Sequence, residues 1–350
     1  MMFGAVQLGI MAACVVLFVP LGMAGWHLSR NKMLFFSCAL FITLSVGVHL
    51  TPYFPSISSL LPSPGFPHSE SSPDLNPNSC ISSLHQVTFS VPKSDTSNKS
   101  WDWAHSELGD RCEFQKLRRQ DASDLLNGSW VVVAGDSQAR LLVVSLLELL
   151  LGSNEVNGDL FKRHSDYSIV LDDIGMKLDY RWAPYVSNLT RLVFDFKDNN
   201  YYPDVLVMGS GLWDMLHVND ASDYGVSLKL LRDSLVMSLP MYPESESGTG
   251  RSPRMFWVGM PMLINSMLNT EEKRERMTDA QWKAYSEEVY RSKLLLGYGG
   301  PLFLLDIHTL SGNCGEECTT DGMHYDGIVY DAAVQVMLNG LVIESNQKLL

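Results

Sequence analysis

The sequence has little positive charge with which to bind a polyanion. Its 350 residues include 26 lysines and arginines against 39 acidic residues, so the formal net charge is −13. The chain also lacks any block of clustered basic residues. Proteins bind nucleic acid largely by neutralising phosphates with lysine and arginine, so this composition argues against a nucleic-acid partner.

Charged residues are also missing from two stretches near the N-terminus. Residues 3–25 are apolar apart from Gln7, and residues 33–50 are uncharged. Each stretch is long enough to cross a bilayer as a helix. The loop between them contains Arg30 and Lys32, which the positive-inside tendency places in the cytosol. We therefore expect residues 1–54 to be a two-helix membrane anchor that leaves the rest of the chain on the lumenal side.

The first stretch has a second interpretation, as a signal segment. It lacks the charged residues that usually precede the apolar part of such a segment. On that interpretation residues 33–50 would anchor the protein by themselves. We prefer the two-helix interpretation.

Proline is concentrated in one segment after the apolar stretches. Residues 51–77 contain seven of the sixteen prolines, among many serines. Such a composition is typical of an extended linker. We expect residues 55–100 to form a stem and residues 101–350 to form one catalytic domain, which is an ordinary size for a single core.

Cysteine is scarce, and four of the six cysteines lie outside the apolar stretches, at Cys80, Cys112, Cys314 and Cys318. An even number in an oxidising compartment permits two disulfides. Cys80 with Cys112 and Cys314 with Cys318 is the simplest of three possible pairings. The last two cysteines with a histidine can also form a zinc site, but without a second cysteine pair the pattern is poor, and we expect no metal.

Three Asn-x-Ser/Thr triplets agree with a lumenal location. They begin at Asn98, Asn127 and Asn188. Each has the form of an N-glycosylation acceptor. Such triplets also occur by chance, so they add only modestly to the topology argument.

Beyond residue 100, short apolar blocks alternate with helical patterns. Strands are predicted at residues 131–134, 167–171, 204–208, 254–258 and 302–305. Helices are predicted at residues 138–151, 226–237, 279–296 and 328–342. Continuous apolar strands separated by helices are typical of a parallel sheet covered on both faces. We expect a three-layer α/β fold with a five-stranded, mainly parallel sheet, whose ligand site lies beyond the carboxyl ends of the strands.

The first predicted strand ends in Gly135-Asp136-Ser137, immediately before a helical pattern. A serine at a strand-to-helix turn lies beside the helix N-terminus, which favours developing negative charge. Ser137 is therefore a candidate nucleophile. The alternative is that the motif is only an ordinary helix N-cap.

A base for this serine is available near the end of the chain. Asp321 and His324 are three residues apart, so that Asp321 can orient the imidazole while the other ring nitrogen takes the serine proton. Asp214 and His217 have the same spacing, and Asp306 lies two residues before His308. We prefer His324 because it follows the last predicted strand and precedes the closing helix.

These motifs carry a family resemblance. Gly-Asp-Ser after a strand and Asp-x-x-His before the last helix resemble the SGNH (GDSL-type) esterase fold. The run from Gly135 to Arg140, the segment Gly209-Ser210-Gly-Leu-Trp213 and the two apolar stretches more narrowly resemble the plant trichome-birefringence-like and PC-esterase group, and within it the altered-xyloglucan type. The resemblance implies an O-acetyltransferase that acts on cell-wall polysaccharide in the Golgi, with its catalytic domain lumenal.

The resemblance also implies a mechanism and partners. Ser137 would attack an acetyl donor, His324 would act as base and then acid, and Asp321 would orient His324. No bound cofactor is expected. The acceptor is a polysaccharide, or a partner protein that carries the acetyl group onward. A carbohydrate acetyl esterase and a catalytically silent polysaccharide-binding scaffold are the alternatives.

The donors for the oxyanion are less well defined. The N–H of Ser137 is expected to contribute, with Gly175 or Gly209 supplying a second N–H. The asparagine that SGNH hydrolases usually carry after the third strand is absent here, and Ser210, the indole of Trp213 or Arg140 can substitute for it.

Other side chains near these motifs have plain structural interpretations. Asp136 is expected to support the turn that presents Ser137. Four aromatic residues can stack on sugar rings but more often pack in a core: Trp101, Trp103, Trp182 and Tyr185.

Overall fold

The computed structural model describes residues 80–347 except 82, 93–98, 106–111, 153–157, 219 and 241–251. The expected anchor, most of the expected stem and Asn98 lie outside these residues. Within the described part, no helix combines the length and the hydropathy that a bilayer crossing requires.

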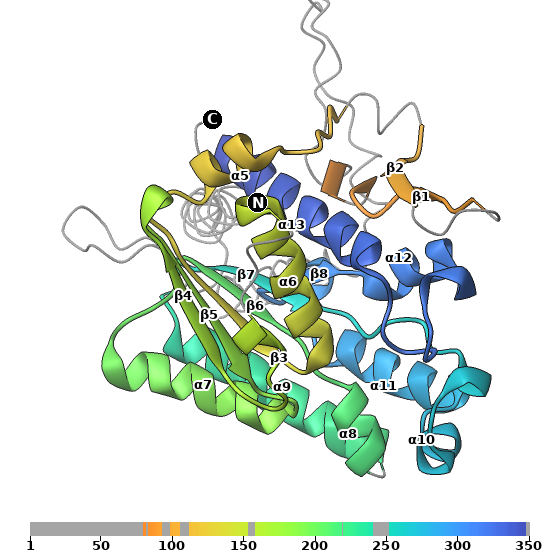
Figure 1. The fold of residues 1–350 in the computed structure, drawn as a ribbon. Helices are drawn as coiled ribbons and strands as arrows, with labels where there is room; N and C mark the ends of the chain where they lie inside the picture. Colours follow the sequence, from red (N-terminus) through yellow and green to blue (C-terminus); the bar gives the residue numbers. More distant parts are fainter. Residues whose placement is uncertain are drawn as a thin grey trace, which may run out of the picture. The chain divides into compact units, whose positions relative to one another are not determined.

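A six-stranded sheet forms the centre of the body (Figure 1). In spatial order its strands are β4 Tyr167–Leu171, β5 Met176–Trp182, β3 Trp130–Gly135, β6 Val205–Met208, β7 Arg254–Val258 and β8 Phe303–Leu305. All neighbours are parallel except β4, which pairs antiparallel with β5 at one edge. The α/β class and the mainly parallel sheet agree with the sequence prediction, but the predicted strand number of five is wrong.

The strand that the sequence prediction missed is β5. Its residues alternate between apolar and charged side chains, whereas the predicted strands were identified as continuous apolar runs. The predicted second strand exists as β4, but it forms the antiparallel edge. β5 instead occupies the position next to β3.

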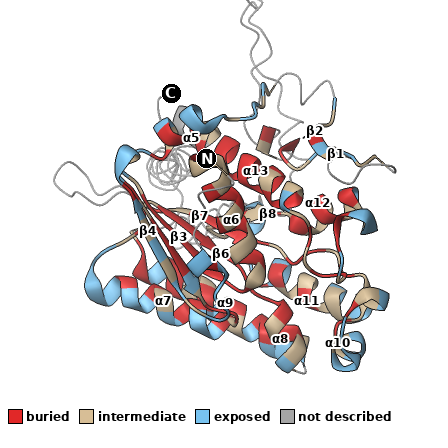
Figure 2. Cartoon of the chain, viewed as in Figure 1, coloured by how far each residue is buried: buried red, intermediate tan, exposed pale blue. Residues whose placement is uncertain are grey.

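Helices cover both faces of the sheet (Figures 1 and 2). One face packs against α5 Arg119–Leu125, α6 Ser137–Leu151, α12 Ile307–Cys314 and α13 Gly327–Gln347. The other packs against α7 Val186–Asn199, α8 Leu212–His217, α9 Ala221–Ser238 and α11 Asp279–Arg291. Side chains of β3 alternate between the two cores, with Val131 and Val133 on the α6 side and Val132 and Ala134 on the α7 side. This alternation follows from the two-residue period of a strand.

The folded body begins earlier than residue 101. Strands β1 Val87–Ser90 and β2 Ser100–Trp103 form an antiparallel hairpin. The hairpin is tied to the C-terminal helices by Asn313 Nδ2, which donates to the Val87 carbonyl at 2.9 Å, and by Trp101 Nε1, which donates to Asp331 at 2.6 Å. The expected boundary between stem and domain at residue 100 is therefore too late, because this hairpin buries apolar side chains such as Val87 in the core.

The described part of the chain contains two disulfides, and they follow the simplest of the three pairings. Cys80 pairs with Cys112 at a Cα–Cα distance of 5.5 Å, and Cys314 pairs with Cys318 at 5.9 Å. Both distances are ordinary for a disulfide. Because Cys314 and Cys318 are bonded to each other, they offer no thiolate for the zinc site considered above.

The order of the parallel strands defines where the chain changes direction in the sheet. After β3 the chain moves outward to β4 and β5, and it then returns to the other side of β3 as β6. In doubly wound sheets the crevice at such a switch point, beyond the carboxyl ends of the strands, is the usual ligand site. Here that crevice lies at the ends of β3 and β6.

Candidate active site

Ser137 is the first residue of α6, directly after the carboxyl end of β3. Asp136 caps this helix, because its side chain accepts a hydrogen bond from the Gln138 N–H at 2.9 Å. The serine is thereby fixed at the positive end of a 15-residue helix. Its own N–H is among the first four of the helix, which have no partner within the helix.

The turn before Ser137 requires glycine. A Cβ atom at Gly135 would lie 2.5 Å from the Gly209 carbonyl oxygen on the neighbouring strand end. At Gly209, a Cβ would lie 2.8 Å from Cβ of Val258. The ends of β3, β6 and β7 therefore approach more closely than residues with side chains allow, and this close approach positions the serine in the crevice.

The structure brings the three predicted catalytic residues together. His324 Nε2 lies 2.8 Å from Ser137 Oγ, and His324 Nδ1 lies 2.7 Å from Asp321 Oδ2. The other carboxylate oxygen of Asp321 accepts from the backbone N–H of Met323 at 3.0 Å and of His324 at 2.7 Å. The serine and histidine are 187 positions apart in the sequence, so only the tertiary fold joins them.

The carboxylate of Asp321 is held in its charged form. Burial by itself raises the pKa of Asp321, but hydrogen bonds from the His324 ring and from the N–H groups of His324 and Met323 outweigh it and keep this pKa below its usual value. An ionised partner on Nδ1 favours the tautomer that leaves Nε2 free to accept a proton.

The loop that carries His324 is tied to the helix that carries Ser137. Gln138 Nε2 donates to the Met323 carbonyl at 3.1 Å, and Tyr330 O–H donates to Gln138 Oε1. Sequence reasoning missed this role of Gln138. Its position beside the nucleophile was the available signal, but a glutamine in the first turn of a helix is ordinarily exposed.

Hydrogen bonds within the loop that carries His324 also stabilise it. Thr319 Oγ1 donates to the His324 carbonyl at 2.7 Å, and it accepts from the Gly322 N–H at 3.1 Å. Gly322 has a φ of +73°, and a Cβ there would lie 2.4 Å from the Ile264 carbonyl oxygen. Glycine is therefore needed at this turn.

The two competing histidines do not contact the serine. His217 lies at the end of α8, where its ring contacts those of Trp213 at 5.4 Å and Tyr185 at 6.2 Å. His308 stacks on Trp282 at 4.0 Å. Among the described residues, His324 is the histidine that forms a hydrogen bond with Ser137.

The carboxyl group three residues before His217 is also unlike Asp321. Asp214 is buried, and one of its oxygens has no hydrogen-bond partner among the described residues. Burial raises the pKa of Asp214 to about 7. A carboxyl group that resists ionisation is a poor orienting partner for a catalytic imidazole.

Two of the expected oxyanion donors are not available. Gly175 precedes β5 and lies against Gly128, which precedes β3, so it is at the opposite end of the sheet from Ser137. The N–H of Gly209 lies near the serine, but it donates to the Ala134 carbonyl at 3.0 Å. Both expectations are wrong, because the sequence alone showed neither which end of a strand Gly175 occupies nor which N–H groups the sheet consumes.

The third expected donor, Ser210, is buried next to this turn. Its hydroxyl has no hydrogen-bond partner within the described part of the chain, and its carbonyl accepts from Tyr224 O–H at 3.2 Å. It remains a candidate donor by chemistry.

A cavity of about 250 Å³ opens over Ser137 and His324. Arg140 lies one helical turn after the serine and lines this cavity, with its guanidinium 5.4 Å from the Trp182 ring. The Nε and Nη2 atoms of Arg140 are buried and have no hydrogen-bond partner among the described residues. Buried guanidinium donors without acceptors are costly, but a molecule in the cavity could contact these two atoms only after a movement of the Arg140 side chain.

The aromatic residues considered above divide into two groups. Trp182 and Trp213 line the cavity, and their rings meet at 5.5 Å in an edge-to-face arrangement. Tyr185 contacts Trp213 at 6.0 Å. Trp101 and Trp103 instead pack the N-terminal hairpin against the body.

Comparison with known proteins identifies a relative along the whole chain. The sequence is 54% identical over 376 residues to Protein ALTERED XYLOGLUCAN 9 of Arabidopsis thaliana, covering 99% of this chain and 100% of that protein. No protein-family model matches the chain. Among solved structures, the crystal structure of TesA is 17% identical and covers 63% of this chain and 99% of that one, with a TM-score of 0.33.

Proposed function

The chain belongs to the trichome-birefringence-like family, in its altered-xyloglucan group, and from this premise we propose that it is an O-acetyltransferase for cell-wall polysaccharide of the xyloglucan or xylan type. We assign its three-layer body to the SGNH type of esterase fold. The observation that carries the proposal is the hydrogen bond of 2.8 Å between His324 Nε2 and Ser137 Oγ. A serine that only capped a helix would need no histidine at this distance.

In the first half-reaction Ser137 Oγ attacks the carbonyl carbon of an acetyl donor while His324 Nε2 takes the serine proton. Asp321 stabilises the imidazolium that forms. The tetrahedral intermediate collapses as the donor's leaving group departs with the proton from His324. The acetyl group is then an ester on Ser137.

In the second half-reaction a sugar hydroxyl attacks the acetyl-serine. His324 removes the hydroxyl proton and returns it to Ser137 Oγ as the ester bond to the enzyme breaks. The product is an O-acetylated sugar, and the enzyme is regenerated. No metal or bound cofactor enters either step.

Negative charge on the carbonyl oxygen develops beside the N-terminus of α6. The Ser137 N–H and the helix dipole favour it there. Arg140, which lines the same cavity as Ser137, adds a positive charge near this position. Ser210 is the remaining candidate.

Hydrolysis is the second candidate function, because the site is partly open to water. The side chains of His324 and Asp321 are 35% and 31% exposed. Water can therefore reach the acetyl-serine and replace the sugar hydroxyl, which would make the protein a carbohydrate acetyl esterase. The acceptor in the transferase reaction can also be a partner protein that carries the acetyl group onward.

We place the reaction in the Golgi lumen, with residues 1–54 as the membrane anchor. The disulfides Cys80–Cys112 and Cys314–Cys318 support an oxidising compartment. Asn127 is exposed, as a glycosylation acceptor must be.

The proposal is tested by incubating the full-length protein with an acetyl donor and xyloglucan or xylan oligosaccharides. Mass spectrometry should show oligosaccharides heavier by one acetyl group. Release of free acetate without any acetylated sugar would favour the esterase. If neither product appears, and no acetyl-serine forms at Ser137, the scaffold interpretation would replace both.

A further inference from the structure

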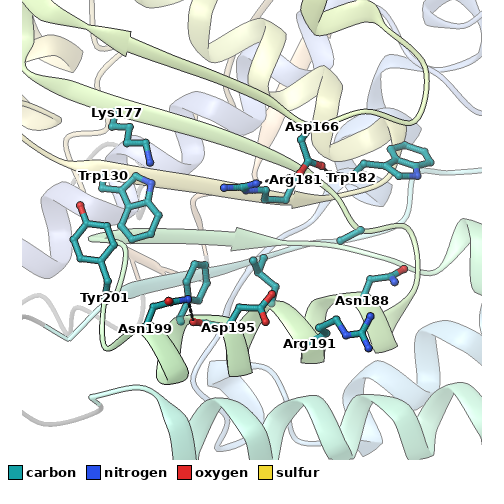
Figure 3. Close-up of a pocket in the computed structure, with 13 residues that line it drawn as sticks. Trp130, Asp166, Lys177, Arg181, Trp182, Asn188, Arg191, Asp195, Asn199 and Tyr201 are labelled. Atoms are coloured by element: carbon teal, nitrogen blue, oxygen red, sulfur yellow. Dashed lines mark hydrogen bonds and ion pairs between the residues drawn. The ribbon is translucent and has the colours of Figure 1, made fainter.

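A second cavity, of about 570 Å³, lies between β5 and α7. We call it the β5–α7 cleft. Figure 3 shows Lys177 and Arg181 on the strand side of this space and Arg191, Asp195 and Asn199 on the helix side. It is larger than the cavity over Ser137.

One face of β5, the strand that lines the cleft, is polar, which is unusual for an inner strand of a sheet. β5 pairs with a strand on each side, so it is not an edge strand. Met176, Leu178 and Tyr180 point into the core beneath α6. The alternate side chains are Lys177, Asp179 and Arg181; Lys177 and Arg181 line the cleft, and Asp179 is buried. Inner strands of parallel sheets are usually apolar on both faces because helices cover both, so this polar face is not built to pack against a helix.

The polar groups of the floor are held in place. Asp179 is buried and accepts from Trp130 Nε1 at 2.8 Å and from Ser168 Oγ at 2.6 Å, and it pairs with Lys177 at 2.9 Å. Burial by itself raises the pKa of Asp179, but these hydrogen bonds outweigh it and keep that pKa below its usual value. Asp179 is therefore ionised and fixed in position by these hydrogen bonds.

A pair of stacked aromatic rings lies at one end of this floor. At this end Tyr201 stacks on Trp130 with ring centroids 4.4 Å apart, and 58% of Tyr201 is exposed. The residue at the other end is Trp182, which lines both cavities and whose side chain packs with the α6-side core. Trp182 pairs with Gly135 in the register of β5 and β3, two residues before the nucleophile.

The cleft and the catalytic cavity share Trp182 as a lining residue. From Lys177 to Trp182 the strand advances by about 17 Å, which is long enough for a short oligosaccharide. A sugar chain presents apolar C–H faces and hydroxyl groups that both donate and accept. The exposed ring of Tyr201 can stack on the C–H faces of the sugars. The guanidinium, carboxylate and amide groups of Arg191, Asp195 and Asn199 can form hydrogen bonds with the hydroxyls. Charges of both signs in the cleft do not favour a polyanion.

We propose that the β5–α7 cleft binds a neutral sugar chain and delivers one of its hydroxyl groups past Trp182 to the acetyl-serine. This proposal rests on the proposed transferase function and adds the acceptor site to it. Tyr201 and the polar side chains of α7 act in binding, and Ser137, His324 and Asp321 act in chemistry.

The binding test uses full-length Ser137→Ala protein, freed of N-glycans because Asn188 lines the cleft. Xyloglucan and xylan oligosaccharides are titrated into it by calorimetry. Adding Tyr201→Ala should weaken binding about tenfold, as expected for the loss of one stacked ring. The matched control is Tyr298→Ala, which removes a tyrosine 54% exposed and in contact with another ring, but outside the cleft. Thermal unfolding shows whether each variant is folded.

The kinetic test separates this proposal from the proposed function. In the active enzyme, Tyr201→Ala should raise KM for the oligosaccharide about tenfold and leave kcat and the turnover of a small acetyl ester unchanged. Unchanged KM and unchanged affinity would overturn the cleft proposal while the transferase stands. A wild-type protein that never forms acetyl-serine would overturn the transferase, and the calorimetric titration would still decide whether the cleft binds sugar.

Discussion

At the scale of single residues, the site depends on a base held from both sides. His324 contacts Ser137 through one ring nitrogen and Asp321 through the other. The pairing was predictable from sequence because Asp321-x-x-His324 follows the last strand and precedes the closing helix; the same spacing at Asp214 and His217 gives no such hydrogen bond among the described residues. The oxyanion donors Gly175 and Gly209 were not predictable, because the use of a backbone N–H depends on the neighbouring strand.

The three residues should therefore fail together when they are replaced. Ser137→Ala and His324→Ala should each reduce kcat by roughly 10⁴–10⁶-fold, and Asp321→Asn by about 10⁴-fold because it stabilises the wrong imidazole tautomer. His217→Ala is the control and should retain most of the activity. Transfer of a labelled acetyl group measures all four. A dead His217→Ala with an active His324→Ala would move the base to the other histidine.

The second prediction at the scale of single residues concerns Asp136 and the pH dependence of the free energy of unfolding. Burial raises its pKa to about 6, from an ordinary value near 4. The folded protein then holds this proton more tightly than the unfolded chain, so stability falls as pH rises between these two values. Asp136→Asn keeps the oxygen that caps α6 and removes the buried charge.

The gain in stability from Asp136→Asn should therefore be small near pH 4 and on the order of 3 kcal/mol above pH 6. Urea unfolding of the variant and the wild type at a series of pH values measures it. A difference that is the same at every pH would show that the carboxyl group titrates normally in the folded protein.

At the scale of elements, continuous apolar runs identified five strands, and each of them is a strand in the structure. β5 was missed because its period of two places charge on one face. The same charged face makes the floor of the β5–α7 cleft. The strand that the prediction missed is thus the strand whose surface we assign to binding; its alternation of apolar and charged residues is itself a strand signal, which a prediction based on continuous apolar runs passes over.

The link between α6 and the histidine loop can be tested with a matched pair of buried glutamines. Gln138→Ala removes the hydrogen bonds to Met323 and Tyr330, so that the loop loses its register with the serine. Gln335 is equally buried and bonds Leu117 through both ends of its amide, at 2.7 Å and 2.8 Å, away from the site. Both variants should lose about 1–3 kcal/mol of stability.

The catalytic activities of Gln138→Ala and Gln335→Ala should differ. Gln138→Ala should lower kcat roughly 10–100-fold with little change in KM, because a small misplacement of the base is costly to the chemical step. Gln335→Ala should keep the wild-type kcat below its melting temperature. Steady-state kinetics and thermal unfolding on the same preparations separate the two effects. Equal losses of kcat would mean that Gln138 acts only through stability.

At the scale of the whole molecule, the lumenal location and the sugar-binding cleft make a joint prediction about glycosylation. Asn127 and Asn188 are both exposed within acceptor triplets. Asn127 precedes β3 and lies at the end of the sheet opposite Ser137, whereas Asn188 lines the cleft. The Asn188 side chain also accepts a hydrogen bond from the Tyr185 N–H at 3.2 Å at the start of α7.

An N-glycan on Asn188 would occupy the space that the acceptor needs, so active enzyme from plant membranes should carry glycan at Asn127 and be unmodified at Asn188. Peptide mapping before and after glycosidase treatment measures both sites. Asn127→Gln should remove the glycan and leave acetyl transfer unchanged, because that end of the sheet is remote from the chemistry. Full occupancy of Asn188 in active protein would contradict the cleft proposal, and a chain without any N-glycan would contradict the lumenal location.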